Sequence, residues 1–155
     1  MKMDKDISLR KADIADIEQI KTILFNSLKE YEIEIPHNYS VSDIDSIEAK
    51  NNIEEVFVLA RNDFVIGFVI LKPISADRIE LKRLYLTASE RGRKLGEHLL
   101  NHAINFACRN NFKYIRLETT SKFKEAVSLY TKHGFTVLKE AEKAPGHDLA
   151  LEKSL

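Results

Sequence analysis

The sequence predicts an α/β fold with a mixed sheet, and two observations support this class. Runs rich in β-branched and aromatic residues alternate with segments of helical period along the 155 residues. In addition, runs at 79–86 and 114–119 flank a long amphipathic helix, and such a unit places its two strands parallel with a right-handed crossover. No repeat, low-complexity stretch or linker interrupts the chain, so we expect a single domain over residues 1–155.

The first third of the chain predicts one strand and two helices. Residues 7–10 form the expected strand, and Asp13 follows it as a candidate N-cap of a helix. Residues 32–40 contain Pro36 and no clear period, which indicates a loop, and residues 41–49 predict a second, short helix. The stripe that defines the first helix consists of Ile17, Ile20, Leu24, Leu28 and Tyr31.

The middle of the chain predicts a hairpin followed by the strand–helix pair. Residues 56–60 and 64–71 are β-rich runs joined by the short turn 61–63. Residues 79–86 predict a central strand, and residues 96–109 predict a long, half-buried helix. The apolar arc of this helix contains Leu95, Leu99, Leu100, Ala103, Ile104 and Ala107.

The last third predicts a strand, a helix and two further strands. The strand at 114–119 leads to a helix at 122–133, and Gly134 is placed to close that helix at its C′ position. Residues 135–139 and 148–151 are the expected final strands. The complete predicted order is therefore β-α-α-β-β-β-α-β-α-β-β.

Composition excludes several classes of protein. The 24 basic residues balance 24 acidic ones, and nucleic-acid binders usually carry a basic excess, so we expect no nucleic-acid partner. A single cysteine, Cys108, excludes an intramolecular disulfide, and its place on the inner side of its helix predicts a core residue. The polar N-terminus and the lack of a long apolar run predict no signal peptide, no membrane partner and a cytoplasmic location.

His98 and His102 lie four residues apart, a spacing that metal ligands also use. Both fall on the expected polar face of the helix, without a third ligand or the glutamate of an H-E-x-x-H motif. We therefore expect no metal site.

The most informative segment is the turn between the central strand and the long helix, Arg91-Gly92-Arg93-Lys94-Leu95-Gly96. The first turn of a helix has backbone N–H groups without intrahelical partners, and the helix dipole makes that end positive. Two glycines allow close approach of an anion, so the turn suits a diphosphate. An ordinary strand–helix turn with a solvated basic face is the alternative. The segment lacks both the P-loop pattern and G-x-G-x-x-G.

Two motifs together resemble the GNAT superfamily of N-acetyltransferases. Arg91 and Gly96 match its motif A, Gln/Arg-x-x-Gly-x-Gly/Ala at the start of a helix, and Gly92 is often found after the arginine. The later stretch AVSLYTKHGF, residues 126–135, is similar to the family signature A-x-x-L-Y-x-x-x-G-F. The resemblance extends over nearly the whole chain. In particular, the chain is similar to a branch of small bacterial GNAT proteins whose substrates are mostly unassigned.

The resemblance implies where acetyl-CoA, the cosubstrate of these enzymes, would bind. The parallel strands should splay around it; the amide of Leu84 should bond the acetyl carbonyl, and Leu86, beyond Tyr85, should pair with the pantetheine. Tyr130 should act as general acid near the sulfur. The expected diphosphate contacts are the backbone groups of Arg91, Gly92, Arg93, Lys94, Leu95 and Gly96.

Two positions depart from the family pattern. Lys94 stands where motif A has its first glycine, and its amide can still donate to phosphate if its φ is negative. Phe123 occupies a position where many relatives have an asparagine that contacts the cofactor, so that contact is not carried over.

The attacking amine must be neutral, so a base is useful. Glu80 on the central strand is the first candidate and Glu118 on the next strand is the second, with a water as a further route. The alternative for Glu80 is a surface carboxylate paired with Lys82 or Arg78. An acidic stretch could favour a cationic substrate or be a solvated face; it contains Glu32, Glu34, Asp43, Asp45 and Glu48.

The expected function is direct transfer of an acetyl group from acetyl-CoA to a primary amine of a small molecule, peptide or protein. The alternative is a regulatory module that holds acetyl-CoA with little turnover, which the departures at Lys94 and Phe123 motivate. Many relatives pair as dimers, so a homodimer is compatible with the resemblance. The sequences of the loops that select the acceptor do not identify it.

Overall fold

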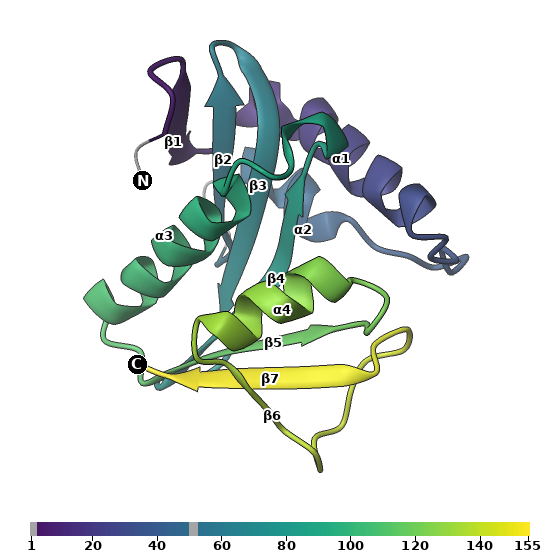
Figure 1. The fold of residues 1–155 in the computed structure, drawn as a ribbon, viewed down its shortest axis with the longest axis vertical. Coiled ribbons are helices and arrows are strands. Elements are labelled where there is room, and N and C mark those ends of the chain that lie inside the picture. Colours follow the sequence, from purple (N-terminus) through teal and green to yellow (C-terminus); the bar gives the residue numbers. More distant parts are fainter. Residues whose placement is uncertain (1–2, 50–52) are drawn as a thin grey trace.

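The computed structural model describes residues 3–49 and 53–155, and within them one seven-stranded sheet has the order β1-β2-β3-β4-β5-β7-β6 (Figure 1). The strands are β1 Ile7–Lys11, β2 Glu55–Arg61, β3 Phe64–Pro73, β4 Arg78–Leu86, β5 Tyr114–Thr119, β6 Thr136–Val137 and β7 Leu149–Ser154. The helices are α1 Ile17–Glu30, α2 Ser42–Asp45, α3 Leu95–Arg109 and α4 Lys124–Lys132, with 3-10 turns η1 Ile14–Asp16, η2 Ser46–Glu48 and η3 Ala88–Glu90. This order confirms the predicted α/β class and its mixed sheet.

β4 and β5 are the parallel pair in the described sheet, and the crossover between them contains α3. Their pairing runs only from Arg78 opposite Tyr114 to Leu81 opposite Leu117. Beyond Leu81 the two strands separate, and Figure 1 shows β4 nearly upright while β5 and β7 run almost horizontally. The predicted splay of the parallel strands is therefore present.

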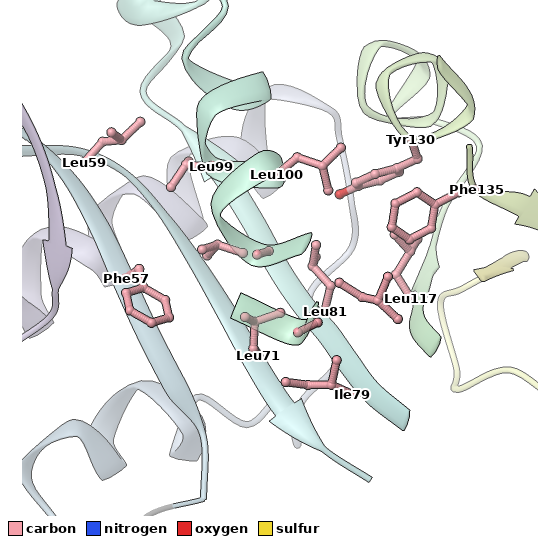
Figure 2. Close-up of a cluster of buried hydrophobic side chains, with 14 of the residues drawn as sticks. Phe57, Leu59, Leu71, Ile79, Leu81, Leu99, Leu100, Leu117, Tyr130 and Phe135 are labelled. Atoms are coloured by element: carbon pink, nitrogen blue, oxygen red, sulfur yellow. The ribbon is translucent and has the colours of Figure 1, made fainter. Parts of the chain in front are cut away.

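Two apolar clusters cover the two faces of the sheet. One joins the sheet to α3 and α4, and the other joins it to α1 and α2. Figure 2 shows part of the first cluster, in which Leu99 and Leu100 of α3 lie over the sheet and Tyr130 of α4 lies beside Phe135. The chain therefore buries apolar surface on both faces around the point where β4 and β5 part.

The start of α1 follows the predicted capping pattern. Asp13 accepts a hydrogen bond from the N–H of Ala15 at 2.9 Å, and the Asp16 carboxylate accepts one from the N–H of Asp13 at 2.8 Å. Both bonds together form a capping box over η1, which leads directly into α1. Asp16 is buried and also pairs with Arg10 at 2.7 Å.

Three predictions about elements need correction. The strand expected at 135–139 is only Thr136–Val137, because β6 lies at the sheet edge with both side chains exposed and pairs with β7 alone. The last strand runs further than 148–151, to Ser154, because β7 pairs with β5 along its whole length. The helix expected at 41–49 is one turn of α-helix followed by the 3-10 turn η2.

Two side chains of α3 were assigned to the wrong face. Cys108 is exposed rather than part of the core. His102 is half-buried, and its ring packs edge-on against Phe57 with 4.4 Å between ring centroids. Phe57 and Phe106 also pack together, so the buried arc is rotated toward these aromatic rings and away from Cys108. No described helix has the length and apolar character needed to span a membrane.

Candidate active site

β4 carries a β-bulge in its ladder with β3, close to where β4 parts from β5. Ile70 of β3 lies opposite Arg83, whereas the next residue, Leu71, lies opposite Leu81. Lys82 is therefore the extra residue of β4 at this point. The bulge lies one residue after the last pair between β4 and β5.

Beyond the bulge, two residues of β4 direct their backbone groups into the gap. The N–H of Thr87 donates to the carbonyl of Ile66 at 2.8 Å, which marks a hydrogen-bonded pair between β3 and the end of β4. Since hydrogen-bonded and non-bonded pairs alternate in an antiparallel ladder, Leu84 and Leu86 point their N–H and C=O groups away from β3. On the side that faces away from β3, a guanidinium N–H of Arg91 donates to the Leu86 carbonyl at 3.3 Å.

A cleft of about 740 Å³ runs along this free strand edge. One wall is formed by the end of α1 and the loop that follows it, and the other by the end of β5, by α4 and by the loop before β7. The floor contains β4, and the far end contains the turn into α3. This volume is ordinary for a site that holds an organic ligand.

The turn into α3 presents a helix N-terminus to the cleft. Arg91, Gly92, Leu95 and Gly96 line the cleft. Lys94 also lines it, but its φ is 61°, in the left-handed region. The negative φ that was the condition for its amide to donate to phosphate is therefore not met. The chain adopts this conformation because Lys94 is the N-cap residue that bends the turn into α3, and its carbonyl accepts the N–H of His98 at 3.2 Å.

The two arginines of the turn have different surroundings. The Arg91 guanidinium bonds Glu30 of α1 as well as the Leu86 carbonyl, and it lies 5.5 Å from the centre of the Tyr31 ring. Arg93 is absent from the cleft lining and lies 3.4 Å from the Glu90 carboxylate. The side chain of Arg91 therefore faces the cleft, whereas that of Arg93 faces η3.

Tyr130 of α4 lines the cleft and is 5% exposed. Its ring lies 5.7 Å from that of Phe135, and Figure 2 shows the hydroxyl directed away from Phe135 toward α3. Burial raises the pKa of Tyr130, and the neighbouring Tyr85 raises it further. The hydroxyl makes no hydrogen bond with any residue that the structure describes. Because its pKa is raised, it is protonated at neutral pH and can donate to a ligand in the cleft.

The two candidate bases have different partners. Glu80 lines the cleft and forms no ion pair or hydrogen bond within residues 3–49 and 53–155. The predicted alternative, pairing with Lys82 or Arg78, is not found, because Lys82 pairs with Asp43 and Arg78 pairs with Glu152.

Glu118 also lines the cleft, but protein groups already bond its carboxylate. It accepts the N–H of Ala144 at 2.6 Å and lies 3.5 Å from both Arg116 and His147. Burial raises the pKa of Glu118, but hydrogen bonds from the Ala144 N–H, His147 and Arg116 outweigh it and lower the pKa overall. Such a carboxylate is a weaker base than a free one.

Aromatic and acidic residues of the cleft differ from the sequence expectation. Tyr31, expected on the apolar stripe of α1, lines the cleft and donates its hydroxyl to Glu125 at 3.2 Å. Phe123 packs its ring 4.9 Å from Tyr31 and 5.9 Å from Tyr85, so it closes an aromatic wall where an asparagine was expected in relatives. Asp43 is neither solvated nor in the cleft lining, because it is 3% exposed and paired with Arg83.

No cluster of three or more histidine, cysteine or acidic side chains that could hold a metal ion occurs in the part of the chain that the structure describes. The groups of the cleft that can take part in chemistry are the edge of β4 beyond the bulge, the α3 N-terminus, Tyr130 and Glu80. Donors aimed at a gap between parallel strands suit the binding and polarisation of an acyl thioester that lies along the strand.

Comparison with known proteins agrees with this class of site. Residues 19–135 match the model of the acetyltransferase (GNAT) family, which covers more than half of the chain. The chain therefore belongs to the acetyltransferase (GNAT) family, and the protein is an acyltransferase.

Individual relatives match over nearly their full length. Spermidine N(1)-acetyltransferase of Thermoplasma acidophilum is 31% identical, over 95% of this chain and 96% of the relative. The PaiA N-acetyltransferase structure from the same organism, in complex with coenzyme A, has a TM-score of 0.75 at 25% identity and covers 96% of this chain and 99% of that one. A GNAT-family acetyltransferase from Staphylococcus aureus has the same fold, with a TM-score of 0.86 at 20% identity over 96% and 98% of the chains.

Proposed function

We propose that the protein transfers the acetyl group of acetyl-CoA directly to a primary amine of a small molecule. The observation that carries this proposal is the edge of β4 at Leu84 and Leu86, which lines the cleft beyond the last residue pair between β4 and β5. Acetyl-CoA supplies an activated acyl thioester, and its amide-rich pantetheine fits an unpaired strand edge. Its diphosphate fits the N-terminal N–H groups of α3.

The Leu84 N–H is proposed to donate to the acetyl carbonyl oxygen as that atom gains negative charge. Deleting a comparable backbone or side-chain donor in other enzymes costs about 3 kcal/mol in the transition state. Because Leu84 belongs to a strand paired with β3, its N–H is held in place before the reaction begins.

Tyr130 is proposed to stabilise the departing sulfur. A thiol with a pKa of about 8.5 leaves as a weakly basic thiolate, so a hydrogen bond from a phenol suffices without complete proton transfer. The raised pKa of Tyr130 keeps the phenol protonated at neutral pH, which suits the role of donor.

Glu80 is proposed to accept the proton of the acceptor amine, directly or through a water. A lysine-like amine with a pKa of about 10.4 is only about 0.04% neutral at pH 7, a handicap of about 4.6 kcal/mol. Of the two carboxylates considered, Glu80 is the one without a protein partner among the described residues, whereas Glu118 is held by Ala144.

The acceptor is proposed to be a small aliphatic amine of the polyamine kind. The relative named a spermidine N(1)-acetyltransferase supports this class. The carboxylates of Glu80 and Glu34 support it too, since both line the cleft and neither has a partner among residues 3–49 and 53–155. Peptide acceptors, a homodimer and a cytoplasmic location remain predictions.

A thiol-release assay with acetyl-CoA and a panel of polyamines, small amines and peptides tests the proposal. We expect turnover with at least one polyamine. Tight binding of acetyl-CoA in calorimetry without turnover of any acceptor would favour the regulatory module instead. Absence of binding would contradict both.

Tyr130→Phe tests the assignment of the general acid. We expect kcat to fall about 10²-fold, with little change in KM for acetyl-CoA, because the lost hydrogen bond acts on the leaving sulfur. The matched control is Tyr114→Phe, which removes a hydroxyl on β5 outside the cleft lining, where the ring lies under Arg78. Equal kcat values for the two variants would refute the role of Tyr130.

A further inference from the structure

A buried carboxylate lies under the bulge of β4, on the sheet face opposite α3. Asp43 of α2 is 3% exposed and accepts a hydrogen bond from Nε of Arg83 at 2.8 Å. Nζ of Lys82 lies 3.6 Å from the same carboxylate. Asp43 therefore holds the two adjacent residues that make up the bulge.

Two consecutive strand residues reach one carboxylate only because the strand is bulged. In a regular strand, side chains alternate between faces, so residues 82 and 83 would point to opposite sides. Here Leu81 and Leu84 both pack in the cluster with α3, and Lys82 and Arg83 both point to Asp43. The ion pairs with Asp43 consequently favour the bulged strand over the regular one.

The bulge also determines which way the Leu84 N–H points. Without it, pairing would continue one-to-one from Leu71 opposite Leu81 and would place Leu84 opposite Phe68. Phe68 lies two residues from Ile66, whose carbonyl bonds β4, so Phe68 also directs its backbone groups at β4. The Leu84 N–H would then bond β3 instead of facing the cleft.

Arg83 also connects the bulge to the loop after α1, which forms one wall of the cleft. Its guanidinium donates to the Tyr39 hydroxyl and to the Ser40 carbonyl, the latter at 3.0 Å, and it lies 5.3 Å from the centre of the Tyr39 ring. Tyr39 lines the cleft. The bulge and the loop after α1 are thus held by one network.

We propose that Asp43 is a positioning residue for acetyl transfer, which acts by holding Lys82 and Arg83 in the bulge that turns the Leu84 N–H toward the acetyl carbonyl. This inference rests on the proposed function and adds a residue outside the cleft lining that the reaction depends on. Asp43 touches neither acetyl-CoA nor the acceptor in this role.

Asp43→Asn tests the proposal, because it removes the charge and keeps the shape. We expect kcat for the best amine of the panel to fall about tenfold, as small displacements of a reacting group do, while the Kd for coenzyme A changes less than about twofold. Coenzyme A lacks the acetyl carbonyl, so its affinity reports the rest of the site. Arg83→Lys should give the same pattern with a smaller loss of kcat, and it serves as the test if Asp43→Asn does not fold.

Infrared difference spectra of bound acetyl-CoA, with and without ¹³C at the acetyl carbonyl, give a readout that needs no acceptor. A hydrogen bond from Leu84 lowers the carbonyl stretch in the wild type, and we expect Asp43→Asn to shift the band back toward its value in water-free solvent. The matched control is Glu152→Gln. It breaks the ion pair between Glu152 and Nε of Arg78, 2.9 Å apart, at the other end of β4, and it should leave the carbonyl band and kcat unchanged.

The outcomes separate the two proposals. If the wild type does not bind acetyl-CoA, the proposed function fails and this inference fails with it. If the wild type binds and shows the lowered band, but Asp43→Asn leaves band and kcat unchanged or Glu152→Gln alters them equally, only the positioning role of Asp43 is overturned.

Discussion

Lys94 has a φ of 61° and a ψ of 20° at the point where the chain enters α3. A side chain in this left-handed region costs roughly 1–2 kcal/mol, and glycine avoids most of that because it has no Cβ. Lys94 stands where the motif A pattern has a glycine, so a residue with a Cβ adopts here a conformation that glycine adopts without strain. The neighbouring Gly92 also has a positive φ, of 80°, and no such strain.

We therefore predict that Lys94→Gly stabilises the protein. The free energy of unfolding should rise by about 0.5–1 kcal/mol, less than the full strain because glycine also gains entropy in the unfolded chain. Urea denaturation at pH 7 measures the change. Lys94→Ala removes the same charge but keeps Cβ, so it should show no comparable gain; equal stability of the two variants would contradict a strained φ.

At the scale of an element, α1 depends on the Asp16 carboxylate, which closes the capping box with Asp13 and pairs with Arg10. The hydrogen bond from Arg10 is the main cause of a lowered pKa of Asp16, and burial opposes it. Because the folded pKa lies below the unfolded value of about 3.9, this contribution is complete above pH 3.9 and is lost as the pH falls through the folded pKa.

Asp16→Asn should accordingly destabilise the protein by about 1–3 kcal/mol at pH 7, the range for hydrogen bonds to a charged group. The difference from the wild type should shrink as the pH falls below about 3.9, where the wild-type carboxylate itself becomes protonated. Denaturation curves at pH 7 and at several acidic values measure both effects. Asp63→Asn, in the exposed turn between β2 and β3, is the control and should be nearly neutral; a pH-independent loss for Asp16→Asn would contradict the linkage.

On the scale of the whole molecule, the cleft is formed by segments from both halves of the chain, from the end of α1 to the loop before β7. A ligand that binds only the folded state stabilises it by about 2.7 kcal/mol at a hundred times its Kd. For about 150 residues this corresponds to a rise in Tm of roughly 5–10 °C.

We predict this rise for acetyl-CoA in a thermal melt, with one transition throughout. A single transition would also bear out the prediction of one domain over residues 1–155. A second transition that acetyl-CoA leaves in place would contradict it. Inorganic pyrophosphate, which lacks the pantetheine, is the control and should give a much smaller rise.

Local patterns in the sequence predicted most of the fold. Alternating runs and helical stripes reflect periods of two and 3.6 residues, which neighbouring residues alone create. The element order, the parallel β4–β5 pair and the Asp13 cap were correct on that basis. The short β6 and the exposed Cys108 were not, because edge pairing and the rotation of α3 toward Phe57 depend on distant residues.

The sequence by itself determined the turn 91–96 and the A-x-x-L-Y run, because each is contiguous and chemically distinctive. Only the tertiary structure decided the surroundings that set their chemistry. Asp43 and Arg83 are 40 positions apart in the sequence, with β2 and β3 between them, yet the fold brings Asp43 against the bulge. No local pattern encodes that contact. Burial, ion pairing and backbone direction at the cleft are properties of residues brought together by packing, so they appear only once the sheet is assembled.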